Sequence, residues 1–183
     1  MTVFGKLRKI HERSRMQILD RIFARKRQDK VTIRALYDHV LAGALDPVLY
    51  ESGAADDTFD GRFEQVALHG ALVLRALRKA GRQNQAKALV DVLFSGFDHA
   101  YRETGVGDSS ISRKVRKLGE RFYGLARGLN EALEEENQQA LVGFLARNSL
   151  ADQAQERLAN YLSNADKALR ENQDVFHAKW PVF

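Results

Sequence analysis

Hydrophobic residues recur every three to four positions along almost the whole chain, which is the period of an amphipathic helix. The clearest case lies over about 110–133, where the apolar positions are Ile111, Val115, Leu118, Phe122, Leu125, Leu129 and Leu133. No stretch alternates convincingly between apolar and polar residues with the period of two that marks a strand. The pattern therefore predicts an all-α fold, a single compact multi-helix domain of about seven helices with no sheet.

Turn-forming residues set the expected ends of these helices. The predicted helices cover about 4–27, 31–44, 61–80, 84–103, 110–133, 137–147 and 151–171. Pro47 stops the second helix and residues 51–61 are predicted as loop. Either Asp60 or Thr58 caps the third helix, and Gly81 ends it. We divide the chain into a basic amphipathic N-terminal helix, a helical domain and a C-terminal tail, over residues 1–30, 31–175 and 176–183.

The composition excludes several classes of protein. Apolar residues make up 44% of the 183 residues and charged residues 29%, as in a soluble globular protein. Cysteine is absent, which excludes disulfides, cysteine metal sites and thiol catalysis. No apolar run approaches the roughly 18 residues of a membrane-spanning helix. Charges at Lys6, Arg8 and Lys9 also interrupt the N-terminus, so we expect no signal peptide and no transmembrane segment.

The formal net charge of +5 is unevenly distributed. Residues 1–30 hold ten basic and three acidic residues, whereas the remainder holds 19 basic and 21 acidic ones. A basic amphipathic helix can lie on an anionic membrane surface, or its apolar side can pack on the domain while its charges stay solvated. Both interpretations remain open. Residues 46–60 have the opposite sign, with five acidic residues and no basic one.

The segment YRETGVGDSSISRKVRKLGERFYG (101–124) has a glycine-rich first half. A Walker phosphate loop needs a preceding strand and a Gly-Lys-Ser/Thr ending, and a dinucleotide fingerprint needs a surrounding βαβ unit. This segment follows a helix and lacks the lysine. We interpret it as a turn between two helices, with Asp108, Ser109 or Ser110 capping the second one.

The second half of the same segment is basic. Residues 113–127 contain one acidic residue, Glu120, and six basic ones: Arg113, Lys114, Arg116, Lys117, Arg121 and Arg127. Arg113, Lys117 and Arg121 share one helix face, away from the apolar stripe. This face is either merely solvated or a docking surface for RNA, anionic lipid or an acidic partner. No aromatic residues interleave it, which weakens a role in stacking single-stranded bases.

The remaining polar candidates are predicted to be structural. His69 lies in mid-helix among apolar residues and has no ligand or carboxylate at metal-binding spacing. Pairing of Arg62 or Arg102 with an acid nearby would tie helix ends together; the acids are Asp98, Glu103 and Asp108. No nucleophile motif occurs. We therefore predict no catalytic residue, no metal and no cofactor, and hence no enzyme; a metal-dependent enzyme using His69, Asp98 and Glu103 is the alternative.

Four segments carry a resemblance to a known family. They are LYDHVLAGALDPVLY (36–50), DTFDGRFEQVALHGALVLRALRKAG (57–81), LVDVLFSGFDHAYRETGVGDSSISRKVRKLGERFYG (89–124) and FLARNSL (144–150). In their order and spacing the chain resembles the ubiquinol–cytochrome c chaperone family. It departs from the family at Leu45, Leu49 and Tyr101, where an arginine, an aromatic residue and a leucine are usual.

The resemblance implies a function. The family is all-α, and its mitochondrial members are assembly factors for respiratory complex III that bind newly made cytochrome b. They associate with the inner membrane and the mitochondrial ribosome and have no known catalytic centre. We therefore expect a bacterial-type assembly chaperone whose client is cytochrome b, with no small-molecule substrate. We expect it to be cytoplasmic and peripheral at the inner face of the cytoplasmic membrane.

Charge suggests which surfaces would meet partners. The acidic loop 46–60 could meet lysines of the client, and the basic helices could meet lipid or the ribosome. The partner-binding candidates are Asp56, Asp57, Arg62, Arg113, Lys114, Lys117 and Arg121. A basic helical module that binds RNA or the ribosome is the alternative function, and it predicts binding that weakens steeply with salt.

Overall fold

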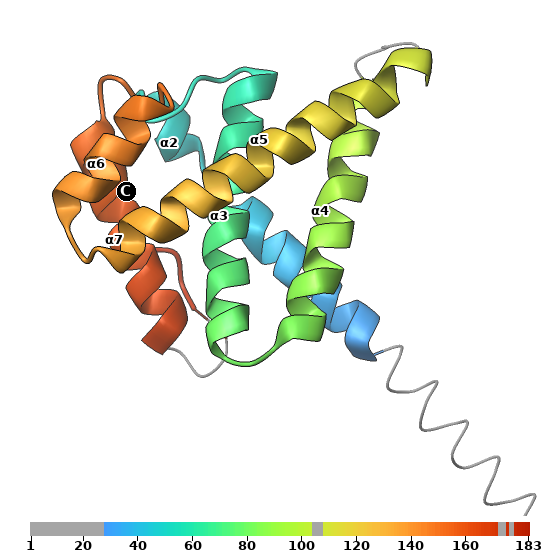
Figure 1. Cartoon of the computed structure of the whole chain (residues 1–183), viewed down its shortest axis with the longest axis horizontal. Coiled ribbons are helices and arrows are strands. Elements are labelled where there is room, and N and C mark those ends of the chain that lie inside the picture. Colours follow the sequence, from blue (N-terminus) through green and yellow to red (C-terminus); the bar gives the residue numbers. More distant parts are fainter. Residues whose placement is uncertain (1–27, 104–107, 172–174, 176–177) are drawn as a thin grey trace, which may run out of the picture.

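The computed structural model describes residues 28–103, 108–171, 175 and 178–183. Its first described helix covers residues 28–44, and six numbered helices follow it along the chain (Figure 1). These are α2 (Pro47–Glu51), α3 (Phe59–Lys79), α4 (Gln83–Glu103), α5 (Asp108–Glu134), α6 (Gln138–Arg147) and α7 (Gln155–Glu171). Within these ranges every regular element is helical, which confirms the predicted all-α fold.

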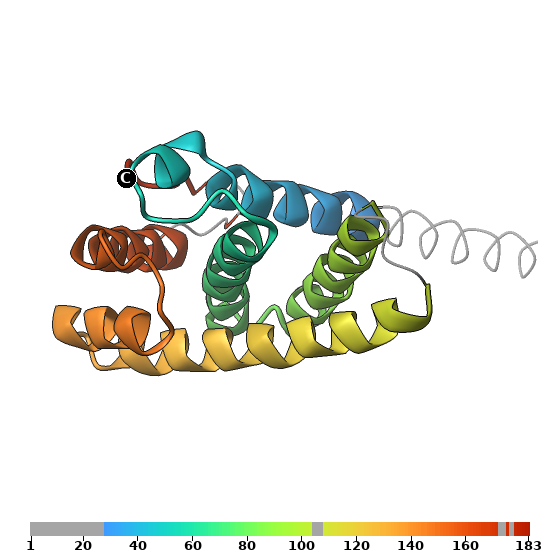
Figure 2. The same ribbon diagram turned by 90° about the horizontal axis from the view of Figure 1, so that it is seen from above.

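The helices are arranged around α3. Helix 28–44 and α5 lie on opposite sides of α3 and α4 (Figure 2), and α5 crosses both of them diagonally (Figure 1). Every residue of α3 from Gln65 to Leu77 is buried. A helix that is covered on all sides forms the core of a domain instead of one face of it. Helices α4, α5 and α7 all pack directly on α3.

Local chemistry explains where α3 begins and ends. Thr58, one of the two predicted caps, fills the N-cap position, and its side-chain oxygen accepts a hydrogen bond of 3.1 Å from the Gly61 N–H. At the other end Gly81 has a φ of +72°, a left-handed conformation that glycine adopts without strain. The Arg82 N–H then donates a 2.8 Å hydrogen bond to the Leu77 carbonyl, which would otherwise lack a partner at the end of the helix. The helix therefore ends just before Gly81, as the sequence predicted.

Pro47 has a second role that the pattern did not predict. Helix 28–44 stops before it, and Pro47 itself opens the five-residue helix α2, which is capped by the Asp46 side chain on the Val48 N–H. Proline suits the first turn of a helix, because the N–H it lacks has no partner there anyway. The predicted loop is therefore shorter, and Glu51 belongs to α2.

Two predicted features fall wholly or partly outside the described residues. The basic helix over about 4–27 lies outside them entirely, as does the centre of the glycine-rich turn, residues 104–107. The flanking helices end at Glu103 and begin at Asp108, close to the predicted positions. Among the described helices none is long and apolar enough to cross a bilayer.

The C-terminal residues 178–183 pack on helix 28–44 and α3. The Trp180 ring stacks on His39, with ring centres 4.8 Å apart, and meets His69 edge-on at 4.8 Å. The Trp180 indole N–H donates a 3.0 Å hydrogen bond to the His39 carbonyl. Gly43 makes this packing possible, since a Cβ there would lie 2.5 Å from Trp180 Cε2 and 2.7 Å from His69 Cδ2.

Candidate functional site

The predicted basic face lies on α5, and the structure divides its members into two groups. Arg113 and Lys117 are exposed and form no ion pair with any residue that the structure describes. Lys114 is half-buried, and its ammonium lies 5.5 Å from the centre of the Tyr101 ring, a cation–π distance. Arg116 pairs along the helix with Glu120 at 3.8 Å. Thus Arg113 and Lys117 keep their charge available to a partner.

Arg121, in contrast, holds two helices together. Its guanidinium pairs with Glu64 of α3, a residue 57 positions earlier in the chain. Burial raises the pKa of Glu64, and the arginine partly offsets this effect. Arg121 is therefore engaged within the domain, whereas its neighbours on the basic face are not.

The acidic segment forms an exposed edge beside the start of α3. Asp57 and Arg62 pair at 2.7 Å, and the Arg62 guanidinium also lies 5.7 Å from the centre of the Tyr50 ring. Asp56 is exposed and makes no ion pair within the described part of the chain. Of the two acidic candidates, Asp57 is thus internally paired and Asp56 is open to a partner.

The polar candidates of α4 pair with one another along that helix. Arg102 bonds to Asp98 at 2.8 Å, and His99 Nε2 lies 3.3 Å from Glu103. Both contacts join residues four positions apart on an exposed face, where such pairs contribute about 0.3–0.5 kcal/mol. Asp108 is the first residue of α5, and its side chain lies outside what the structure describes.

His69 is buried and has both ring nitrogens engaged. Nδ1 lies 2.8 Å from the Gln65 carbonyl and Nε2 lies 2.8 Å from the Tyr161 hydroxyl. A carbonyl only accepts, so Nδ1 carries the hydrogen and Nε2 accepts from Tyr161. Burial lowers the pKa of His69 to about 4 and raises that of Tyr161. The ring is neutral and has no free lone pair for a metal, and its geometry is that of a structural residue.

A buried network of charged residues was not predicted from the sequence. Arg75 of α3 is 5% exposed and Asp166 of α7 is 2% exposed, and they meet at 3.2 Å. The Arg75 Nη1 atom also donates to Asn130 and Glu134 of α5, each at 3.1 Å. The network joins three helices at one point. The only signal in the sequence was a single arginine within the apolar run from Leu72 to Leu77.

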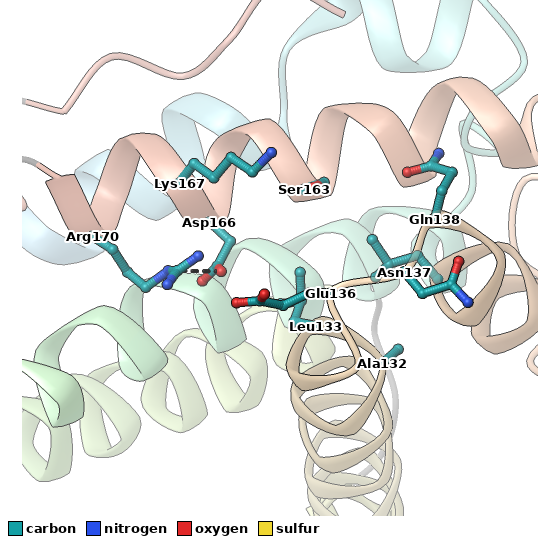
Figure 3. A pocket seen from close by; sticks show the side chains of 10 residues that line it. Ala132, Leu133, Glu136, Asn137, Gln138, Ser163, Asp166, Lys167 and Arg170 are labelled. Atoms are coloured by element: carbon teal, nitrogen blue, oxygen red, sulfur yellow. Dashed lines mark ion pairs between the residues drawn. The ribbon is translucent and has the colours of Figure 1, made fainter.

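A small polar cavity of about 260 Å³ opens beside this network, between α7 and the turn from α5 to α6. Figure 3 shows Asp166 at its wall with Arg170 bonded to it, at a distance of 2.9 Å. Arg75 holds one carboxylate oxygen of Asp166 and Arg170 holds the other. Both carboxylate oxygens of Asp166 thus carry an arginine partner, and the residue holds α3 and α7 together.

A more apolar depression surrounds Tyr123 of α5. Two shallow cavities of about 310 and 330 Å³ share Tyr123 and Arg78 as lining residues. Tyr123 is 54% exposed although it stacks on Phe94 of α4, with ring centres 5.8 Å apart. We call this surface, formed by α3, α4 and α5, the Tyr123 groove. An exposed aromatic residue in a depression lined by both apolar and charged side chains is common at surfaces that a partner covers.

The described residues offer no recognisable place for a metal. No three of their His, Asp or Glu side chains are grouped as a metal ion would require. Glu103 pairs with His99 and Asp98 with Arg102, so the acids of the hypothetical metal site already have partners. The surfaces that remain suit the binding of another macromolecule.

Comparison with known proteins agrees with this conclusion. The ubiquinol-cytochrome c chaperone family pattern matches residues 51–176. The chain belongs to the ubiquinol-cytochrome c chaperone family. The fold is also similar to the crystal structure of the Cbp3 homolog from Brucella abortus, with a TM-score of 0.77 and 27% sequence identity. That match covers 90% of this chain and 97% of the other. Among curated proteins, the sequence has no significant match.

Family membership, together with this structural relative, supports a role as an assembly chaperone for respiratory complex III.

Proposed function

We propose that this protein is a non-enzymatic assembly chaperone that binds newly made cytochrome b near the membrane and hands it to the cytochrome bc complex. The observation that carries the proposal is the family match over residues 51–176, which includes all of α3 to α7. The client in the proposal is a membrane protein. A chaperone that receives it needs a surface for apolar segments that are not yet in their final place.

The Tyr123 groove is the surface that we assign to the client. It combines the exposed Tyr123 ring with half-buried Phe94 and Val90 of α4. Charged residues from both sides of the groove, among them Arg78, Lys87 and Asp91, surround this apolar centre. Such an anatomy, apolar inside and polar at the rim, is common in protein–protein interfaces.

Deleting the gene tests the function. The proposal predicts less assembled complex, measured by native electrophoresis and haem absorbance, with cytochrome b transcript unchanged. Restoring the gene in trans should restore the complex. Normal levels of complex in a clean deletion would overturn the proposal.

Crosslinking in cells tests the groove. A photoreactive phenylalanine analogue in place of Tyr123 should capture cytochrome b, identified by mass. The same analogue in place of Ala146, an exposed residue of α6, is the control and should not. Capture of cytochrome b from Ala146 and not from Tyr123 would contradict the assignment of the groove and favour a client surface on α6.

The open charges of Arg113 and Lys117 support the second candidate, RNA or ribosome binding, which fits the same fold. Reversing both charges should abolish salt-sensitive RNA binding if that function holds. Arg121 is left unchanged in this test, because its pairing with Glu64 means that its replacement would also disturb the domain.

A further inference from the structure

The two cavities of the Tyr123 groove meet at one cation. Arg78, from the last turn of α3, lines both of them, and among the described residues Tyr123 is the only other one that does. The α4 half of the groove continues over Ala86 and Val90, and the α5 half continues over Ala126. Arg78 therefore lies between two depressions that both contain apolar side chains.

The charge of Arg78 is not compensated within the domain. Its side chain is exposed and forms no ion pair with any residue that the structure describes. The two acids that line the α5 half already have partners, since Glu134 lies 3.1 Å from Arg75 and Glu131 lies 3.9 Å from Arg127. The guanidinium group of Arg78 is thus open to a carboxylate from outside.

The surrounding sequence makes this end of the groove basic. Residues 65–90, which run along α3 and through the turn into α4, contain five Lys or Arg residues and no acidic one. The first acid after them is Asp91. It lies one helical turn from Lys87 on the same half of the groove, so the charges of these two residues largely offset each other. Arg78 lines the groove without such an offset.

We infer that the Tyr123 groove recognises an apolar client segment that carries one Asp or Glu, with the Arg78 guanidinium binding that carboxylate and the Tyr123 ring packing on the apolar residues beside it. Arginine presents its N–H groups as a planar fork that fits both oxygens of a carboxylate. Apolar walls that exclude water strengthen such a pair relative to one on an open surface. Arg78 would therefore select among apolar segments.

A surface of many phosphates matches the groove less well than a single carboxylate does. RNA and anionic lipid layers both present many negative charges close together. Asp91, Glu131 and Glu134 lie along the groove and would repel a partner of that kind. A segment with one carboxylate brings only one negative charge, and Arg78 compensates it.

The proposed function supplies the nature of the client, and the inference rests on it in that respect. Ionisable residues within membrane-spanning segments are rare, and in the finished protein they pair with other groups of the bundle. Before assembly such a carboxylate has no partner, and its exposure to lipid is costly. A groove that offers an arginine beside apolar side chains would hold the segment until its final partner is in place.

Crosslinking in cells, with the captured residue mapped, tests the inference on the full chain. The photoreactive phenylalanine analogue at position 123 is the probe, and mass spectrometry identifies the crosslinked peptide. We expect an apolar segment with an Asp or Glu within about four residues of the crosslink, the span of one helical turn. A captured segment without a carboxylate in this range would overturn the inference, as would the absence of any captured protein.

Two neighbouring substitutions locate the effect. Arg78→Gln and Lys79→Gln remove the same charge from exposed positions in the last turn of α3, but only Arg78 lines the groove. Arg78→Gln should lower the yield of crosslinked client about fivefold or more, and Lys79→Gln should change it less than twofold. Both variants should unfold at the same temperature. Equal losses of yield would show a general effect of charge and overturn the inference.

A pair of peptides measures the contact directly. One fluorescein-labelled peptide reproduces the captured segment, and the second has Asn or Gln in place of its Asp or Glu. By fluorescence anisotropy the unaltered protein should bind the second peptide about fivefold more weakly or worse, whereas the Arg78→Gln variant should bind both equally. The four affinities form a double-mutant cycle. Independent effects of the two changes would overturn the inference.

Failure of the inference can be told apart from failure of the proposed function. If the gene deletion lowers complex III while Arg78→Gln leaves capture unchanged, the inference is rejected and the function stands. If the deletion leaves complex III normal while capture still depends on Arg78, the function is rejected and Arg78 remains the carboxylate contact of another client. Salt-sensitive RNA binding that Arg78→Gln abolishes would place RNA in the groove and overturn the inference.

Discussion

Charges are handled differently on the two sides of α3. On the α7 side they are inside the protein, where Arg75 and Asp166 are almost fully buried and linked to further polar groups. On the side of α4 they are at the surface, where Arg102 pairs with Asp98 within one helix. A buried pair is costly to break, because the remaining charge loses both its partner and its water. The first side therefore fixes the fold, and the second is free to meet partners.

The largest contrast is expected from removing one acid on each side. Asp166→Ala leaves Arg75 and Arg170 without their shared carboxylate and should lower the free energy of unfolding by about 3–5 kcal/mol. Asp98→Ala removes an exposed partner and should cost about 0.2–1 kcal/mol. Urea denaturation followed by circular dichroism measures both. Similar losses in the two variants would contradict the division of roles.

The same substitution at two glycines should have opposite signs. Gly43→Ala places a methyl group against Trp180 and His69 and should destabilise the protein by about 1–3 kcal/mol. Gly124→Ala lies on the exposed surface of α5, where a Cβ would touch nothing within 4 Å, and should stabilise by about 0.5–1 kcal/mol. Thermal unfolding gives the order of stability.

Fluorescence adds a local readout to this pair, because Trp180 is the sole tryptophan. Its emission should shift to the red in the Gly43 variant and not in the Gly124 variant. Gly43→Ala with native stability and emission would contradict the packing of the C-terminal residues.

A smaller effect is expected from pH. The folded pKa of His69 is about 4, below its ordinary value of 6.5, so between these values the unfolded chain binds a proton that the folded one does not. The stability from His69 is complete above pH 6.5 and is lost as pH falls towards 4. From pH 7 to pH 5 the loss is about 2 kcal/mol, and His39, whose pKa burial also lowers, acts in the same direction.

Denaturation of a His69→Gln variant at both pH values checks this prediction. The variant starts from lower stability because its contacts to Gln65 and Tyr161 change. Its further loss between pH 7 and pH 5 should be clearly smaller than that of the unaltered protein. A loss of the same size would show that His69 is not the titrating group.

Periodicity predicted the helices well because it is a local property. The apolar spacing from Leu118 to Leu133 was enough to place most of α5. Helix α2 was not predicted, since five residues hold too few turns to show a period and Pro47 is also a common helix terminator. The choice between Thr58 and Asp60 as the cap of α3 needed the hydrogen bond itself.

Contacts between distant residues were beyond the sequence. The charge of Arg121 predicted its exposure to solvent, but its partner Glu64 lies on another helix, and no local pattern links the two. Arg75 and Asp166 are 91 residues apart, and Trp180 bonds to a carbonyl 141 residues away. The charge pattern therefore supplied candidates for binding, while the tertiary fold decided which of them, such as Lys117 and Asp56, keep their charge free.

The fully buried stretch of α3 from Gln65 to Leu77 has a consequence for how the molecule can be divided. This helix depends on neighbours from before and after it in the chain for its cover, including Leu36 and Val40 of helix 28–44 and residues of α7. Removing either neighbour would expose apolar residues of α3 to water, so a piece that contains α3 but lacks helix 28–44 or α7 is not expected to be stable by itself. We therefore expect the domain to fold and unfold as one unit. Its surface residues can change without loss of the fold only while α3 and the residues that cover it are kept.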